Sequence, residues 1–140
     1  MAKRGVAGIL ATVPLFEDLA PRHLKRIRDI TELADYMAGA SIVREGADGD
    51  SFFVILRGQA KVSVRGRTIN RLRPGDHFGE ISLLDGGKRS ASVVSETPMT
   101  LAIIQRDAFM RIVRQEPTIA SKILKELASR IRMVDRSLAG

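Results

Sequence analysis

The segment from residue 78 to 93 combines glycine, a carboxylate, an arginine and small hydroxyl residues at short spacing. Residues 80–84 are good helix formers but fill little more than one turn. The N–H groups at a helix start can hold an anion, and Gly79 lets a ligand approach the backbone closely. Arg89 follows ten residues after Gly79 and has a planar fork suited to phosphate oxygens. The segment therefore predicts a site for an anionic ligand.

The neighbouring polar residues suggest a ligand with more than one polar group. Ser90 and Ser92 add hydroxyl donors, whereas Glu80 is unfavourable beside an anion unless it binds another part of the ligand. A carboxylate accepts hydrogen bonds well from a sugar hydroxyl, so the set indicates a nucleotide-like ligand. Each residue alone could also have a purely structural role. Gly79 could be a turn glycine, Glu80 a carboxylate favoured by the helix dipole, and Arg89 a surface residue. The joint spacing favours the ligand site.

Composition excludes several other kinds of site. The 140 residues suit one domain and contain no Cys, which removes disulfides, thiolate metal ligands and a cysteine nucleophile. The two histidines, His23 and His77, are far apart, and no catalytic triad or general-base pair is evident, so we expect neither a metal nor an enzyme. The chain has no proper signal-peptide core and no run of about 20 apolar residues, which predicts a cytoplasmic protein.

The formal net charge of +7 is carried by the two ends of the chain. Residues 1–30 contribute +3 and residues 106–140 contribute +4, whereas residues 31–105 are neutral. The basic residues alternate with apolar ones at helical spacing, which is typical of solvated helix faces. The alternative is a basic module that binds nucleic acid or another anionic partner, although aromatic residues amount to only 4%.

The patterns predict a helix, then short strands, then two helices. A helix begins at Pro21 and has an apolar stripe, and residues 31–105 show short apolar runs punctuated by glycine. Pro117 separates the two final helices, the second of which is long. Its apolar stripe is Ile119, Ile123, Leu127, Ile131, Val134 and Leu138, widened by Leu124 and Ala128. This order predicts a β-sandwich or barrel flanked by helices.

The central segment resembles the phosphate-binding cassette of the cyclic nucleotide-binding domain family. The matching residues are Phe78, Gly79, Glu80, Ile81, Ser82, Leu83, Leu84, Arg89, Ala91, Ser92 and Val93. The order of the remaining segments is also similar to that of the family. The resemblance implies an eight-stranded β jelly-roll barrel with an N-terminal helix and two C-terminal helices. It implies a single domain over 1–140: an N-terminal helical segment (1–30), a barrel (31–105) with the cassette (78–93), and C-terminal helices (106–140).

The resemblance also implies a role for each site residue. Glu80 would bind the ribose 2′-hydroxyl, and Arg89 the cyclic phosphate. Ser90 and the N–H groups of Ile81, Ser82 and Ala91 would assist Arg89, with Gly79 giving close approach. The last helix would close over the base as a lid through an inward stripe of Leu124, Leu127 and Ile131. Arg130 would contact the base from that helix, its alternative role being a solvated charge.

The resemblance leaves the ligand and the biological context open. Ser90 permits either cAMP or cGMP, and we favour cAMP as the commoner bacterial ligand. Some family members continue into a helix-turn-helix domain, and others belong to channels or to the regulatory subunit of protein kinase A. No such domain is evident in this sequence, so it is either a stand-alone bacterial sensor or a fragment of a larger chain, and the Met1 start favours the stand-alone form. Its downstream protein is unidentified, and the last helix offers a face for homodimer formation.

Overall fold

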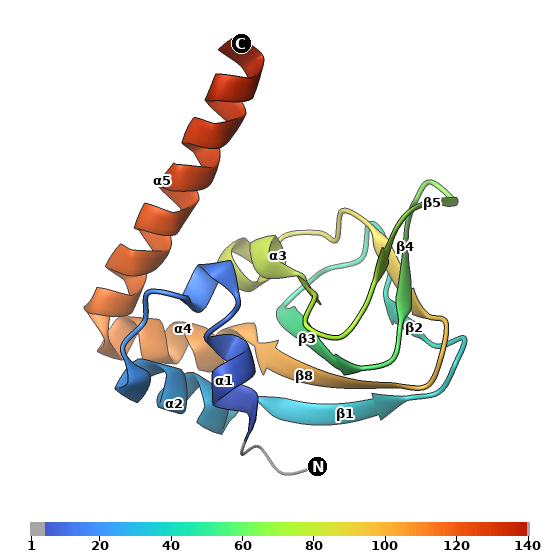
Figure 1. Cartoon of the computed structure of the whole chain (residues 1–140), viewed down its shortest axis with the longest axis horizontal. Helices are drawn as coiled ribbons and strands as arrows, with labels where there is room; N and C mark the ends of the chain where they lie inside the picture. The colour runs from blue at the N-terminus through green and yellow to red at the C-terminus, as the bar shows by residue number, and fades with distance from the viewer. Residues whose placement is uncertain (1–4, 140) are drawn as a thin grey trace.

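The computed structural model describes residues 5–139, and side chains as far as residue 137. Eight strands are flanked by helices at both ends of the chain (Figure 1). The strands are β1 (Glu32–Tyr36), β2 (Ser41–Val43), β3 (Ser51–Arg57), β4 (Ala60–Val64), β5 (Arg67–Leu72), β6 (His77–Phe78), β7 (Ser92–Ser95) and β8 (Met99–Gln105). The helical segments are α1 (Val6–Leu10), η2 (Pro14–Phe16), α2 (Pro21–Ile30), α3 (Glu80–Asp85), α4 (Arg106–Gln115) and α5 (Pro117–Ala139).

The strands form two antiparallel four-stranded sheets. The first has the order β1-β8-β3-β6 and the second the order β2-β7-β4-β5. The strand number expected from the sequence is confirmed, whereas closure of the two sheets into one barrel remains a prediction. A turn follows β5, in which Gly75 has a φ of +94° and the Asp76 N–H bonds the carbonyl of Arg73 at 2.9 Å.

Residues 52–56 of β3 are all apolar, and both faces of the strand are covered. Phe52 and Val54 belong to the core between the first sheet and the helices, whereas Phe53 and Ile55 belong to the core that includes residues of the second sheet. Successive side chains of a strand point to opposite faces, so a strand with one polar face would leave one of these cores incomplete. Strand β3 is therefore held between the two cores.

The N-terminal region contains more helical segments than expected. The sequence predicted one helix, which corresponds to α2, and the structure adds α1 and η2 before it. Phe16 of η2 packs edge-on against Phe52 at a centroid distance of 5.8 Å and also contacts Phe109 of α4. Residues 1–4 of the expected N-terminal segment lie outside the described part of the chain. The added segments complete the helical side of the first core.

Helix α5 has two different halves. Ile119 and Ile123 near its start are buried, whereas Leu124, Ile131 and Val134 have 57–66% of their surface exposed. Figure 1 shows the later turns projecting away from the sheets. The expectation that Leu124 and Ile131 point inward is therefore wrong for this structure, whereas Leu127 is partly buried against the first core. Leu138 lies beyond the described side chains. Within residues 5–139, no helix is long and apolar enough to cross a membrane.

Candidate functional site

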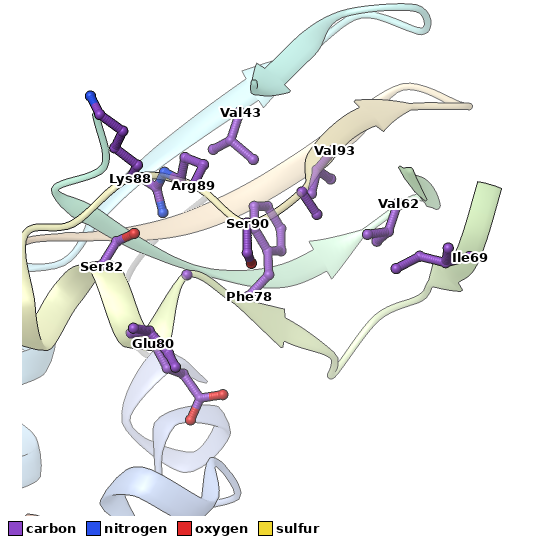
Figure 2. Close-up of a pocket in the computed structure, with 13 residues that line it drawn as sticks. Val43, Val62, Ile69, Phe78, Glu80, Ser82, Lys88, Arg89, Ser90 and Val93 are labelled. Atoms are coloured by element: carbon purple, nitrogen blue, oxygen red, sulfur yellow. The ribbon is translucent and has the colours of Figure 1, made fainter. Parts of the chain in front are cut away.

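A pocket of about 390 Å³ lies between α3 and the second sheet (Figure 2). This volume is in the range of small-ligand sites. Seven of the eight site residues predicted from the sequence line it: Gly79, Glu80, Ile81, Ser82, Arg89, Ser90 and Ala91. The eighth, Arg130, is not part of the lining but forms an ion pair with Glu80. Apolar side chains complete the pocket: Val43, Val62, Ile69, Phe78 and Val93.

Glycines fix the short helix α3 at both ends. Gly79 precedes it with a φ of +90°, and Gly86 ends it with a φ of +68° while its N–H bonds the carbonyl of Ser82 at 2.8 Å. Both conformations are left-handed and favour glycine. The first N–H groups of the helix have no intrahelical acceptor. The local sequence therefore places unpaired donors next to the pocket.

The Arg89 side chain lies in a narrow slot between two glycines. A Cβ atom on Gly79 would lie 2.8 Å from Nη1 of Arg89, and one on Gly49 would lie 2.6 Å from Nε. Nη1 donates to the carbonyl of Ser51 at 2.9 Å, and the guanidinium lies 5.6 Å from the centre of the Phe53 ring. The backbone of Arg89 is also paired on both sides, since its N–H bonds Ala47 and its carbonyl accepts from Gly46. Main-chain hydrogen bonds therefore position the arginine, and the two glycines leave space for its side chain.

Arg89 is a buried cation without a carboxylate partner. Its exposed fraction is 9%, and among the described residues no carboxylate forms an ion pair with it. Burial lowers the pKa of Arg89, and the charge of Asp50 acts at longer range in the opposite direction. Arginine nevertheless stays charged at neutral pH. A buried, unpaired guanidinium that lines a pocket provides a site for an anion.

Glu80 is held by side chains that come from two other elements. Its Oε2 accepts a hydrogen bond from Nη2 of Arg130 on α5 at 2.8 Å, and its Oε1 lies 3.2 Å from Nδ1 of His77 on β6. Burial raises the pKa of Glu80, but His77 and Arg130 outweigh it, so the pKa lies below its ordinary value. Figure 2 shows the carboxylate pointing away from Arg89 and Ser90. Glu80 and Arg89 therefore do not meet.

Three contributors to this site were missed by the sequence reading. In the sequence, Gly49 is not distinguishable from the other glycines between the strands. The contact of the Ser51 carbonyl with Arg89 cannot be predicted from the sequence either, because every residue has a carbonyl. Lys88 lines the pocket and pairs with Asp48 at 2.9 Å, which its position next to Arg89 could have indicated. Among the described residues, no group of three or more His, Asp or Glu side chains is placed to hold a metal ion.

A family model and a curated relative match much of this chain. Residues 33–116 match the model of the cyclic nucleotide-binding domain. The cAMP-dependent protein kinase regulatory subunit of Aspergillus fumigatus is 39% identical over 114 residues, covering 79% of this chain and 27% of that protein. The chain therefore spans little more than a quarter of this relative.

Solved structures of other proteins have the same fold. The N-terminal domain of a transcriptional regulator from Streptomyces coelicolor matches with a TM-score of 0.85 and 23% identity, over 93% of this chain and 94% of that one, which establishes the fold. A structure described as cAMP-bound PfPKA-R matches with a TM-score of 0.70 and 27% identity, over 90% of this chain and 47% of that one. The family match covers more than half of the chain and includes the segment that holds Arg89 in its slot. The chain is thus a member of the cyclic nucleotide-binding domain family.

Proposed function

We propose that this protein is a non-catalytic cytoplasmic sensor in which the chain 1–140 acts as one unit and binds cAMP in the pocket beside α3. Arg89 pairs with the cyclic phosphate, assisted by Ser90 and the N–H groups of Ile81, Ser82 and Ala91, and Glu80 binds the ribose 2′-hydroxyl. The buried guanidinium of Arg89, which has no carboxylate partner among the described residues, carries this proposal. The names of the fungal kinase subunit and of the cAMP-bound structure favour cAMP over cGMP.

The ligand signal leaves the pocket through α5. Arg130 connects this helix to Glu80, so a nucleotide that engages Glu80 changes the restraint on α5. A ligand shifts a conformational equilibrium only if it interacts differently with the two states, and the Glu80–Arg130 contact provides such a difference. In the second state α5 closes over the base, with Arg130 in contact with it.

The exposed half of α5 pairs with a second copy of the chain. Leu124, Ile131 and Val134 are exposed and lie at spacings of seven and three residues, as in a helix–helix seam. Multi-angle light scattering tests this directly, and Ile131→Lys should give a monomer. A monomeric wild-type protein at high concentration would overturn this part of the proposal.

Calorimetric titration of the full chain with cAMP and cGMP in parallel tests the proposed function. We expect one site per chain, tighter binding of cAMP, and at least about tenfold loss in Arg89→Ala because a charge-assisted contact is removed. Arg73→Ala is the matched control, since Arg73 is exposed and is not among the pocket residues. Absence of binding by both nucleotides, or unchanged affinity in Arg89→Ala, would contradict the proposal. Salt-dependent retention on DNA would instead support the alternative of a nucleic-acid-binding module.

A further inference from the structure

The imidazole of His77 lies against the carboxylate of Glu80 without a completed hydrogen bond. Its Nδ1 is 3.2 Å from Oε1 of Glu80, yet this atom is buried and has no hydrogen-bond partner among the described residues. The ring packs against Phe52 at a centroid distance of 5.6 Å, and 23% of the side chain is exposed. His77 is therefore held in place with Nδ1 within ion-pair distance of the Glu80 carboxylate.

The charge on His77 decides how strong this contact is. A neutral imidazole with its proton on the other nitrogen would point a lone pair at the carboxylate, whereas a protonated imidazole donates from Nδ1 and adds an opposite charge. The other charged groups around the pair lie on α5: Arg130 donates to Glu80, and Glu126 accepts from Nε of Arg130 at 3.2 Å. On β3, the packed neighbour is the uncharged Phe52. Protonation of His77 thus strengthens the restraint on Glu80.

The position of the carboxylate links this restraint to the pocket. Figure 2 shows the carboxylate of Glu80 directed away from Arg89 and Ser90, so it must turn to meet a sugar hydroxyl of a nucleotide held by Arg89. Such a turn weakens the contacts with His77 and Arg130. We propose that His77 makes nucleotide binding proton-linked: protonated His77 holds Glu80 away from the pocket, and affinity falls as the pH falls. This inference rests on the proposed function, because it takes Glu80 to bind the 2′-hydroxyl.

The sign follows from the linkage between protons and ligand. Protonated His77 is stabilised by Glu80 while the carboxylate stays where it is, and loses that partner when Glu80 turns towards a nucleotide. Nucleotide binding therefore releases protons, and affinity rises with pH over the range in which histidine titrates, between about pH 5 and 8.

Calorimetric titration of the full chain with cAMP at about pH 5.5 and 7.5 tests the inference. We expect at least about threefold weaker binding at the lower pH in the wild type, and a difference below about 1.5-fold in His77→Gln and His77→Phe. The phenylalanine variant keeps a ring against Phe52, and the glutamine variant keeps a polar donor. His23→Gln is the matched control, because His23 is the other histidine of the chain, and this variant should keep the pH dependence. Wild-type protein with 2′-deoxy-cAMP should show little pH dependence, since this ligand does not require Glu80 to turn.

The outcomes separate this inference from the proposed function. If cAMP binds but the pH dependence persists in both His77 variants, or is equally strong with 2′-deoxy-cAMP, the proton link through His77 is wrong while the sensor function stands. If the wild-type affinity does not change with pH, the inference is equally overturned. If no cyclic nucleotide binds at either pH, the proposed function itself fails.

Discussion

Main-chain groups and the space left by two glycines position the guanidinium of Arg89, whereas the side chains of β6 and α5 position the carboxylate of Glu80. Arg89 lies between Gly49 and Gly79 and donates to a main-chain carbonyl. Glu80 depends on His77 of β6 and Arg130 of α5. The expected phosphate end of the pocket is therefore built in advance, while the expected ribose end must rearrange.

Under the proposed function, this difference would let one pocket both bind a nucleotide and transmit the binding event to α5. A preformed cation gives affinity without conformational cost. A carboxylate shared with α5 makes binding depend on a helix whose later turns have no core contacts, and such an element belongs to the low-stability part of a structure. Variants at the two ends should accordingly behave differently.

The largest effect should come from changing the shape of the preformed cation. We expect Arg89→Lys to weaken cAMP binding by at least about tenfold, because a lysine keeps the charge but cannot reproduce the planar fork. The same calorimetric titration measures this loss, and a thermal melt controls for folding. Unchanged affinity would mean that Arg89 contributes only its positive charge and not the shape of its guanidinium group.

The slot around the arginine should matter almost as much. In Gly49→Ala the new methyl group would lie 2.6 Å from Nε of Arg89 and 2.5 Å from Oγ of Ser82. We expect about a fivefold to tenfold loss of affinity from displacement of the guanidinium. Gly8→Ala is the matched control, since a Cβ there meets nothing within 4 Å, and it should bind as the wild type does. Equal affinities in the two variants would show that the slot does not position Arg89.

Glu80 should give a smaller effect that depends on the ligand. We expect Glu80→Gln to weaken cAMP binding by about threefold to tenfold and to change 2′-deoxy-cAMP binding much less, because a carboxylate is the stronger acceptor. A cycle of wild type and variant with both ligands isolates the coupling. Simple additivity of the two changes would show that Glu80 and the 2′-hydroxyl do not touch.

Helix α5 should respond to ligand even though none of its described residues lines the pocket. We expect cAMP to increase amide protection in residues 121–137 as well as in residues 78–92, because closure over the base orders the exposed turns. Hydrogen exchange with and without cAMP measures both segments. Protection confined to residues 78–92 would mean that α5 is not a lid and that Arg130 is only a partner of Glu80.

The smallest effect concerns stability without added nucleotide. The pKa of Glu80 is lowered in the folded protein, so its charged form adds stability that is complete above the ordinary carboxyl pKa and is lost as the pH falls through the lowered value. We expect Glu80→Gln to be less stable than wild type by under about 1 kcal/mol at pH 7, because Arg130 is partly exposed. Urea unfolding at pH 7 and near pH 3 measures this, and a difference that persists at the lower pH would contradict it.

Local sequence determined most of the cassette and the order of the elements. The left-handed conformations at Gly79 and Gly86 confine α3 to six residues, and Pro117 begins a new helix directly after α4. The short apolar runs within residues 31–105 indicated strands, of which β3 is one. These features could be read from the sequence because glycine, proline and hydrophobic periodicity act through the few residues around them.

Tertiary structure decided what holds the two charged residues and where α5 lies. Gly49 and Ser51 reach Arg89 through the packing of β3, and His77 and Arg130 meet Glu80 from positions 3 residues before and 50 residues after it. The apolar stripe of α5 was evident, but periodicity shows only that a face exists and not which surface covers it. Ile119 and Ile123 are buried while Ile131 is exposed, because α5 leaves the core after its first turns. Contacts between segments far apart in the chain depend on the packing of the whole fold, and local sequence patterns do not specify that packing.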